Sequence, residues 1–319
     1  MKLLTREDVE SAQRIVYDAM PPTPQIAWPL LAERLGTTVW VKHENHTPLG
    51  AFKVRGGLVY LHGLKAREPD CAGVIAATRG NHGQSVAFAA ARHGLNATIV
   101  VPRGNSVEKN AAMRALGAEL VEHGDDFQAS REHAATLARE RSLHFVPSFH
   151  RDLVLGVSTY WIEFFKAVQP SVVFVPIGQG SGICACIAAR AFTGAKDTRI
   201  VGVVSAHATA YLDSFRARRA LDAPVSTVLA DGMACRVADD EPLALMLRDL
   251  DDVIAVTDDE VAEAMRVMFS CTHNAAEGAG AASLAAALQQ RERWRGKTIG
   301  VTLCGANVDR ALFAEVLAG

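Results

Sequence analysis

The sequence of 319 residues lacks the marks of several large protein classes. It has no excess of charge of one sign, because 33 Lys and Arg stand against 35 Asp and Glu. No basic stripe or block suits a nucleic acid or an anionic membrane surface. No apolar run approaches the roughly 20 residues that a membrane span needs. The first residues, Met1 to Asp8, turn acidic at once and lack the apolar core of a signal peptide. We therefore expect no nucleic-acid partner and no membrane association.

Cysteine is also sparse, and its 6 copies are scattered along the chain. Their spacing fits neither a C-x-x-C pair nor a zinc ribbon, so a reduced enzyme with a cytoplasmic location is expected. No internal repeat, low-complexity tract or long linker is present, and composition alone therefore shows no domain boundary. The length allows two domains or one large one, and 49% apolar residues can supply a substantial core.

Short apolar runs alternate with helical segments throughout the chain. The expected strands are 38–42, 74–77, 97–102, 119–121, 172–175, 200–204 and 298–303. The expected helices include 84–93, 107–116, 129–141, 183–192, 257–269 and 281–290. Because the strands are continuously apolar rather than alternating, they suit parallel sheets that helices cover on both faces. The sequence predicts an α/β protein.

A lysine among glycines carries the first chemical signal. Lys53 lies in the run Leu49-Gly50-Ala51-Phe52-Lys53-Val54-Arg55-Gly56-Gly57. A lysine becomes a nucleophile when its surroundings lower its pKa, and it can then hold an aldehyde as a Schiff base. A lone lysine near glycines is usually a solvated surface residue, so this run by itself is weak evidence.

Three further segments follow Lys53 in order. They are Thr78-Arg79-Gly80-Asn81-His82-Gly83-Gln84, Gly178-Gln179-Gly180-Ser181-Gly182 and Leu303-Cys304-Gly305-Ala306-Asn307. The second of these comes after a buried strand and precedes a helix, so its backbone N–H groups suit a phosphate. The four segments in this order resemble the fold type II pyridoxal-phosphate enzymes, and most of all the serine/threonine dehydratases and serine racemases. The resemblance extends over nearly the whole chain.

This resemblance implies an architecture and a cofactor. Fold type II enzymes have two domains, each with a mostly parallel sheet flanked by helices, and pyridoxal phosphate lies in the cleft between them. We place a small inserted domain at residues 68–147 and a large domain at residues 1–67 and 148–319. Members of the family are commonly homodimers, and the same is expected here.

The resemblance also implies roles for individual side chains. Lys53 is the cofactor-binding and catalytic lysine, with Phe52 beside it. Asn81 is expected to donate a hydrogen bond to the ring oxygen of the cofactor, and Cys304 to face the pyridine nitrogen. Glu277 is expected near the ring edge, although an acid at a helix N-terminus is favourable in its own right. The phosphate is assigned to Gly178, Gln179, Gly180, Ser181 and Gly182, and the substrate carboxylate to Thr78, Arg79, Gly80 and His82. For His82, a structural hydrogen bond to a backbone carbonyl is the more usual role.

Several residues depart from the family pattern. Ala51 replaces a phosphate-binding serine, while Gln179 and Ser181 replace glycines, and the Ser181 hydroxyl can restore a lost hydrogen bond. Arg79 stands where dehydratases carry a small residue and racemases carry a serine that acts as the second acid/base. Because arginine stays charged it is a poor proton shuttle, which disfavours racemisation, but it binds carboxylates by two parallel hydrogen bonds. We hypothesise that Arg79 contacts the substrate carboxylate or the cofactor, with a salt bridge to a local acid as the alternative.

The implied reaction is the dehydration and deamination of a 3-hydroxy-α-amino acid to a 2-oxo acid and ammonia. Serine or threonine, phenylserine and 3-hydroxyaspartate stay open as substrates, with Phe149 as a candidate to pack an aryl group. Racemisation, β-replacement and cofactor binding without turnover are the alternatives. The segment equivalent to the racemase metal site reads Val204-Ser205-Ala206-His207 and lacks its acidic ligand, so no activating cation is expected.

Overall fold

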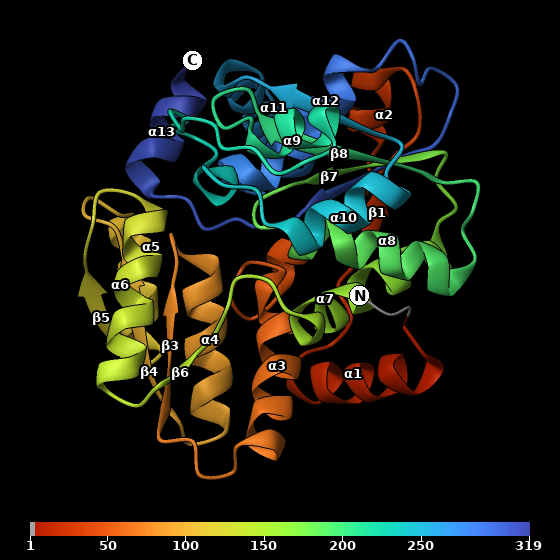
Figure 1. Cartoon of the computed structure of the whole chain (residues 1–319). Helices are drawn as coiled ribbons and strands as arrows, with labels where there is room; N and C mark the ends of the chain where they lie inside the picture. The colour runs from red at the N-terminus through yellow and green to blue at the C-terminus, as the bar shows by residue number, and fades with distance from the viewer. Residues whose placement is uncertain (1–3) are drawn as a thin grey trace.

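The computed structural model describes residues 4–319, and Met1–Leu3 of the expected N-terminal stretch lie outside the described part. Two sheets organise the chain (Figure 1). The larger sheet has six strands in the order β1 (Gln25–Ala27), β2 (Val39–His43), β10 (Ile299–Leu303), β7 (Val172–Pro176), β8 (Arg199–Ser205) and β9 (Asp252–Val256). All its neighbouring strands are parallel except β1 and β2. The smaller sheet is parallel throughout, in the order β5 (Glu119–Glu122), β4 (Asn96–Val101), β3 (Gly73–Ala77) and β6 (His144–Phe145).

Helices cover the two faces of the larger sheet. On one face lie α7 (Arg151–Ala167) and α8 (Ser181–Thr193), with α10 (Asp240–Asp249) packed on α8 and α9 (Ala210–Ala217) on α10. On the other face lie α12 (Gly278–Gln289), α11 (Asp258–Thr272), α2 (Pro29–Leu35) and α13 (Arg310–Ala318). Alternate residues of β7 supply the two layers, because Val173 and Val175 join the α7–α8 core while Val172 and Phe174 join the α11–α12 core.

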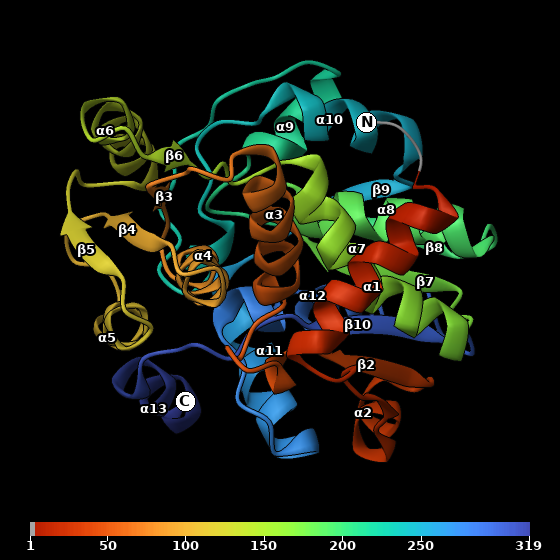
Figure 2. The same cartoon turned by 90° about the horizontal axis from the view of Figure 1, so that it is seen from below.

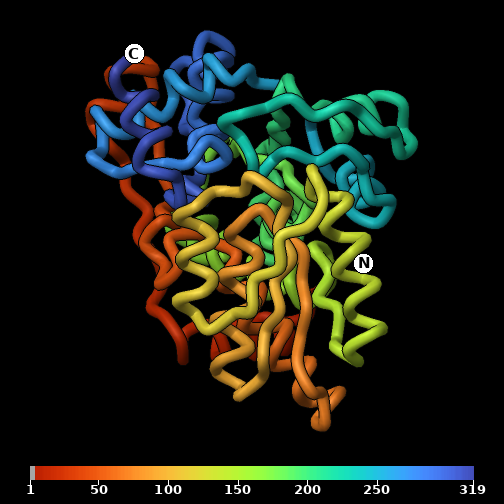
Figure 3. Tube along the Cα trace, turned by 90° about the vertical axis from the view of Figure 1, so that its left-hand side faces the viewer, coloured from red at the N-terminus to blue at the C-terminus, as the bar shows by residue number. Residues whose placement is uncertain are grey.

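The smaller sheet lies between α6 (Phe127–Glu140) on one face and α4 (Asn81–Arg92) and α5 (Val107–Ala115) on the other (Figure 2). Helix α3 (Lys53–Arg67) packs against both α4 and α7, and α1 (Arg6–Ala19) packs against α3 and α7. The α7–α8 core therefore continues from the large sheet to the face of the small sheet that α4 and α5 cover. Figure 3 shows the segment that contains the small sheet lying against the rest of the chain.

Local chemistry fixes several element ends. Helix α11 begins after Thr257, whose hydroxyl accepts a hydrogen bond from the N–H of Glu260, while the Glu260 side chain accepts one from the N–H of Thr257. Helix α8 ends at Gly194, whose φ of 73° favours glycine. The one-turn helices η1 (Glu44–His46) and η2 (Asp231–Met233) complete the elements of the described part.

A buried ion cluster lies under the start of α3. Arg55 donates to Glu44 at 2.8 Å and to Glu163 at 2.6 Å, and Lys42 donates to Glu163 at 2.5 Å. Lys42, Glu44 and Arg55 are fully buried, so their charges must be paired to be tolerated. The cluster holds two cations and two carboxylates, and it anchors the helix turn that begins with Lys53.

The structure confirms the expected α/β fold with two mostly parallel sheets. Each expected strand is present within about two residues of its expected ends. The small sheet runs from Gly73 to Phe145, inside the segment 68–147. The domain bounds themselves stay a prediction, because α3 packs against helices of both parts. Within residues 4–319, no helix combines the length and the apolar character that a membrane crossing requires.

Candidate active site

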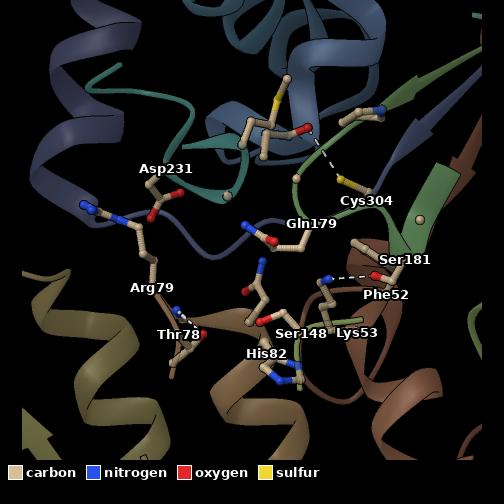
Figure 4. A pocket seen from close by; sticks show the side chains of 18 of the residues that line it. Phe52, Lys53, Thr78, Arg79, His82, Ser148, Gln179, Ser181, Asp231 and Cys304 are labelled. Atoms are coloured by element: carbon tan, nitrogen blue, oxygen red, sulfur yellow. Dashed lines mark hydrogen bonds between the residues drawn. The ribbon is translucent and has the colours of Figure 1, made fainter. Parts of the chain in front are cut away.

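A cavity opens where the carboxyl ends of parallel strands from the two sheets meet (Figure 4). Ala77 ends β3 and Pro176 ends β7, and both line it. Such strand ends are the usual ligand-binding edge of an open α/β sheet. Every residue assigned from the sequence to the cofactor or to the substrate carboxylate lines this one cavity: Phe52, Lys53, Thr78, Arg79, Gly80, Asn81, His82, Gly178, Gln179, Gly180, Ser181, Gly182, Glu277 and Cys304.

Lys53 is the first residue of α3, and its side chain lies on the cavity wall. Its Nζ donates a hydrogen bond to the Ser181 hydroxyl at 2.9 Å. Within residues 4–319 no carboxylate oxygen lies within 4.0 Å of this amine. Burial lowers the pKa of Lys53 from 10.5 to about 8, because the charged form loses its water. A useful fraction of the amine is therefore neutral and nucleophilic near neutral pH.

Two cysteine thiols also line the cavity. Burial raises the pKa of Cys235 to about 11 and raises that of Cys304 further above its ordinary value. Both thiols are therefore protonated at neutral pH and do not balance a charge on Lys53. Cys304 contacts the carbonyl oxygen of Ala279 with its Sγ at 3.5 Å.

The loop between β7 and α8 presents a cradle of backbone donors. The N–H groups of residues 178–183 find no protein acceptor in the described part of the chain, as is usual for a helix start. Gly180 has a φ of 94°, which favours glycine. A Cβ on Gly178 would lie 2.5 Å from the carbonyl oxygen of Gly232, so the backbone passes too closely for a side chain. Free donors at the positive end of a helix suit an anion.

A polar chain crosses the cavity from the small sheet's helices to the larger part. Asn81, at the start of α4, donates to Glu277 at 2.5 Å, and the Asn307 side chain donates to Oδ1 of Asn81 at 2.8 Å. Lys109, in the first turn of α5, lies 2.6 Å from Asp231 and 3.0 Å from Glu277. Burial alone would lower the pKa of Lys109, but Glu277 and Asp231 raise it well above its ordinary value. Lys109 is therefore charged at neutral pH.

The sequence analysis missed Lys109 and Asp231 as site residues. A lysine in the first turn of a helix gives no signal of burial, and Asp231 begins the one-turn helix η2, which is too short to leave a sequence pattern. Only their pairing across 122 residues brings them to the cavity. Ser148, Tyr160 and Met233 line the cavity as well and carried no motif of their own.

Arg79 lies in the turn between β3 and α4, on the cavity wall. The salt bridge that was weighed as its alternative role is absent, since no carboxylate in residues 4–319 lies within 4.0 Å of its guanidinium. Its Nε is buried and donates to no acceptor in that same range. Gln179 has a similar unused atom: its amide nitrogen donates to Cys235 Sγ at 3.0 Å, while its Oε1 is buried without a donor. Figure 4 shows the Arg79 side chain extending past Asp231 at the left of the view, while the Gln179 side chain lies nearer the middle.

Two further expectations concern Thr78 and His82. The Thr78 hydroxyl accepts from the N–H groups of Gly80 at 2.9 Å and Gly83 at 3.2 Å, so it stabilises the turn itself. Burial lowers the pKa of His82 to about 3, and the nearby Lys53 charge lowers it too, while a hydrogen bond with the backbone of Val146 opposes them. His82 is therefore neutral, in keeping with a structural role.

Phe149 does not line the cavity, so the expectation that it packs an aryl group is wrong. It packs against the core that α7 and α8 share, while its neighbour Ser148 lines the cavity. The aromatic residues of the wall are Phe52, Phe127 and Tyr160. Within residues 4–319 no group of three or more His, Cys, Asp or Glu side chains is arranged to hold a metal ion.

Comparison with known proteins places this geometry among enzymes. The family model described as pyridoxal-phosphate dependent enzyme matches residues 16–305. The chain is 35% identical over 304 residues to the biosynthetic L-threonine dehydratase of Haemophilus influenzae, covering 92% of this chain and 58% of that one. It is 31% identical over 317 residues to the L-threonine ammonia-lyase of Thermotoga maritima, covering 99% of this chain and 78% of that one. The chain thus spans less than two thirds of the length of the first of these relatives.

The fold is similar to that of a solved plant enzyme as well. The processed form of threonine deaminase isoform 2 from Solanum lycopersicum superposes with a TM-score of 0.88 at 27% sequence identity. The superposition covers 100% of this chain and 97% of that one. The match includes both sheets and therefore the cavity between them.

Proposed function

The chain belongs to the pyridoxal-phosphate-dependent enzymes, and from this premise we propose that it eliminates the β-hydroxyl of a 3-hydroxy-α-amino acid as water. The released enamine tautomerises to an imine, and hydrolysis of the imine takes up one water and gives a 2-oxo acid and ammonia. The observation that carries the proposal is the amine of Lys53, which lies on the cavity wall 2.9 Å from the Ser181 hydroxyl and has a pKa lowered to about 8. The names of the relatives, a threonine dehydratase and a threonine ammonia-lyase, favour elimination over other reactions. The family match confirms the resemblance and the cofactor expected from the four sequence segments.

The residues of the cavity fit pyridoxal phosphate. Its phosphate is an anion, and the loop at residues 178–183 offers N–H donors that no protein acceptor in the described range uses. Its aldehyde needs an amine, and Lys53 supplies one that is buried without a carboxylate partner in that range. We assign the ring contacts to Asn81 and Cys304, whose side chains line the same cavity.

The chemistry divides between the cofactor and the protein. Bound pyridoxal phosphate supplies an electron-withdrawing ring that makes the Cα proton of an amino acid acidic. The neutral amine of Lys53 accepts that proton, and its lowered pKa keeps the neutral form accessible. The hydrogen bond to Ser181 holds the Nζ atom against the phosphate loop, which limits its reach. The turn at residues 78–82 is assigned to the α-carboxylate, and the Thr78 hydroxyl holds the shape of that turn by accepting from the N–H groups of Gly80 and Gly83.

The proposal is tested by 2-oxo acid release from the cofactor-loaded protein. L-Serine, L-threonine, L-threo-phenylserine and 3-hydroxyaspartate are the substrates, and Lys53→Ala is compared with Lys166→Ala, a replacement at an exposed lysine late in α7. We expect release from at least one substrate, a loss of at least about a hundredfold in Lys53→Ala, and wild-type rates in Lys166→Ala.

Chiral analysis of the unreacted amino acid accompanies the same assay. If an amino acid is inverted at Cα and no substrate yields oxo acid, the protein is a racemase and the proposal is wrong. If the protein binds the cofactor but no substrate reacts, it is a cofactor-binding protein without turnover. Size-exclusion chromatography of the preparation tests the expected homodimer.

A further inference from the structure

We propose that the cavity is built for a 3-hydroxy amino acid with a second carboxylate on Cβ, the 3-hydroxyaspartate class, and that Arg79 and Gln179 determine this preference. The inference rests on the proposed function, since it names the substrate class of that same site. It is carried by two buried polar atoms on the cavity wall that no protein group in residues 4–319 satisfies, one a donor and one an acceptor.

The donor is Nε of Arg79. A buried N–H that finds no acceptor is rare in folded proteins, because it gives up its bond to water without a replacement. The guanidinium is planar and permanently charged, and its parallel N–H groups match the two oxygens of a carboxylate. An anionic group of the ligand would satisfy both the orphaned donor and the charge.

The other cations of the wall do not compete for this role. Lys109 is already paired with Asp231 at 2.6 Å and with Glu277 at 3.0 Å, so its charge is balanced by carboxylates of the protein. That pairing also neutralises Asp231, which would otherwise repel an incoming carboxylate. Lys53 is assigned to the cofactor. Arg79 is therefore the permanent cation of the wall that has no carboxylate within 4.0 Å in the described range.

The acceptor is Oε1 of Gln179. The amide nitrogen of Gln179 is held by Cys235 Sγ at 3.0 Å, which fixes the plane of the amide and leaves Oε1 to a donor from the ligand. A β-hydroxyl is such a donor. The cavity therefore offers a cation for a carboxylate and an acceptor for a hydroxyl, and 3-hydroxyaspartate carries both groups on one carbon.

The other candidate substrates would satisfy fewer of the polar groups on the cavity wall. Serine has no further β-substituent and threonine adds a methyl group, so beyond the β-hydroxyl, which we assign to Gln179, neither provides a second acceptor or a negative charge for Arg79. The aryl ring of phenylserine could contact Phe127 and Met233, which also line the cavity, but it would leave that donor unpaired. A site with buried polar groups discriminates strongly against a substrate that leaves them unpaired.

The first test compares kcat/KM for L-3-hydroxyaspartate, as threo and erythro isomers, with that for L-serine and L-threo-phenylserine. We expect the wild type to prefer one 3-hydroxyaspartate isomer by at least about tenfold. In Arg79→Ala the ratio of kcat/KM for 3-hydroxyaspartate to that for serine should fall by at least about thirtyfold. Arg103→Ala, at an exposed arginine of the same region, should keep the wild-type ratio. Equal losses on both substrates would mean that Arg79 binds the α-carboxylate, and would overturn the inference, as would a preference for phenylserine.

The second test measures binding without turnover. Succinate, a dicarboxylate that lacks an amino group, should raise the melting temperature of the cofactor-loaded wild type and not that of Arg79→Ala, while acetate should raise neither. If serine yields oxo acid but 3-hydroxyaspartate does not, and succinate has no effect, the inference fails while the proposed function stands. If no substrate yields oxo acid, the proposed function fails, and the succinate shift still decides whether Arg79 receives a carboxylate.

Discussion

Lys109 offers a quantitative test of the charge balance that holds the cavity together. It lies on α5, beside the small sheet, while its partners Asp231 and Glu277 belong to segments packed on the large sheet. The Lys109 and Glu277 side chains are only 6% and 3% exposed, and that of Asp231 is 20% exposed. Replacing Lys109 with Met keeps most of the apolar stem but leaves two carboxylates close together without their cation.

The expected cost follows from this burial. Breaking a buried ion pair by removing one partner costs about 3–5 kcal/mol, since a charge stays buried without compensation. Asp231 regains part of its hydration because it is partly exposed, and Glu277 keeps its hydrogen bond from Asn81. We therefore expect Lys109→Met to lower the free energy of unfolding by about 3 kcal/mol, the low end of that range. Adding Glu277→Gln removes one stranded charge, so the double variant should be more stable than Lys109→Met alone.

The measurement is urea unfolding without cofactor, followed by circular dichroism and by tryptophan fluorescence, with Lys166→Met as the exposed control. Coincident transitions are required before a single free energy is assigned. The pKa of Lys109 is raised on folding, so its contribution is fully present below the ordinary lysine value of 10.5 and is lost as the pH rises through the higher folded value. A Lys109→Met variant within about 0.5 kcal/mol of the wild type at neutral pH would refute this reasoning.

Two further predictions concern the loop that we assign to the cofactor phosphate, and Lys53, to which we assign catalysis. Gly180→Ala should weaken cofactor affinity in equilibrium dialysis by at least about tenfold. A Cβ at this position would lie 2.5 Å from Pro242, and the φ of 94° disfavours any residue with a side chain. Gly194→Ala, with a φ of 73° and open space, should cost only backbone strain of about 1 kcal/mol and bind cofactor normally. The absorbance change on adding pyridoxal phosphate to the cofactor-free protein should grow faster as pH rises through about 8, where Lys53 loses its proton. A rate that stays flat across that pH would contradict the lowered pKa of Lys53.

Seven of the ten strands in residues 4–319 were predictable, because a parallel sheet covered on both faces needs continuous apolar runs. The other three, β1, β6 and β9, lie at sheet edges and were not predicted. Helix α3 escaped prediction because Gly56 and Gly57 are poor helix formers. The structure gives their reason: a Cβ on Gly56 would lie 2.9 Å from the Leu153 carbonyl oxygen of α7, and one on Gly57 would meet Ser85 of α4. These glycines serve close packing between helices, and no local pattern distinguishes that use from a turn.

The same distinction between local sequence signals and contacts made only on folding applies to the candidate site. The strand–loop–helix segments around Lys53, Asn81 and Gly180 could be read from the sequence, because each carries its own chemistry within a few residues. The charges could not, since a cation's role depends on whether an acid meets it in space. Lys109 and Arg79 are both basic residues at the start of a helix or just before one, yet the first meets two carboxylates and the second meets none within 4.0 Å in residues 4–319. That difference exists only after folding, and it is the ground on which we infer that the charge of Arg79 selects among β-substituents.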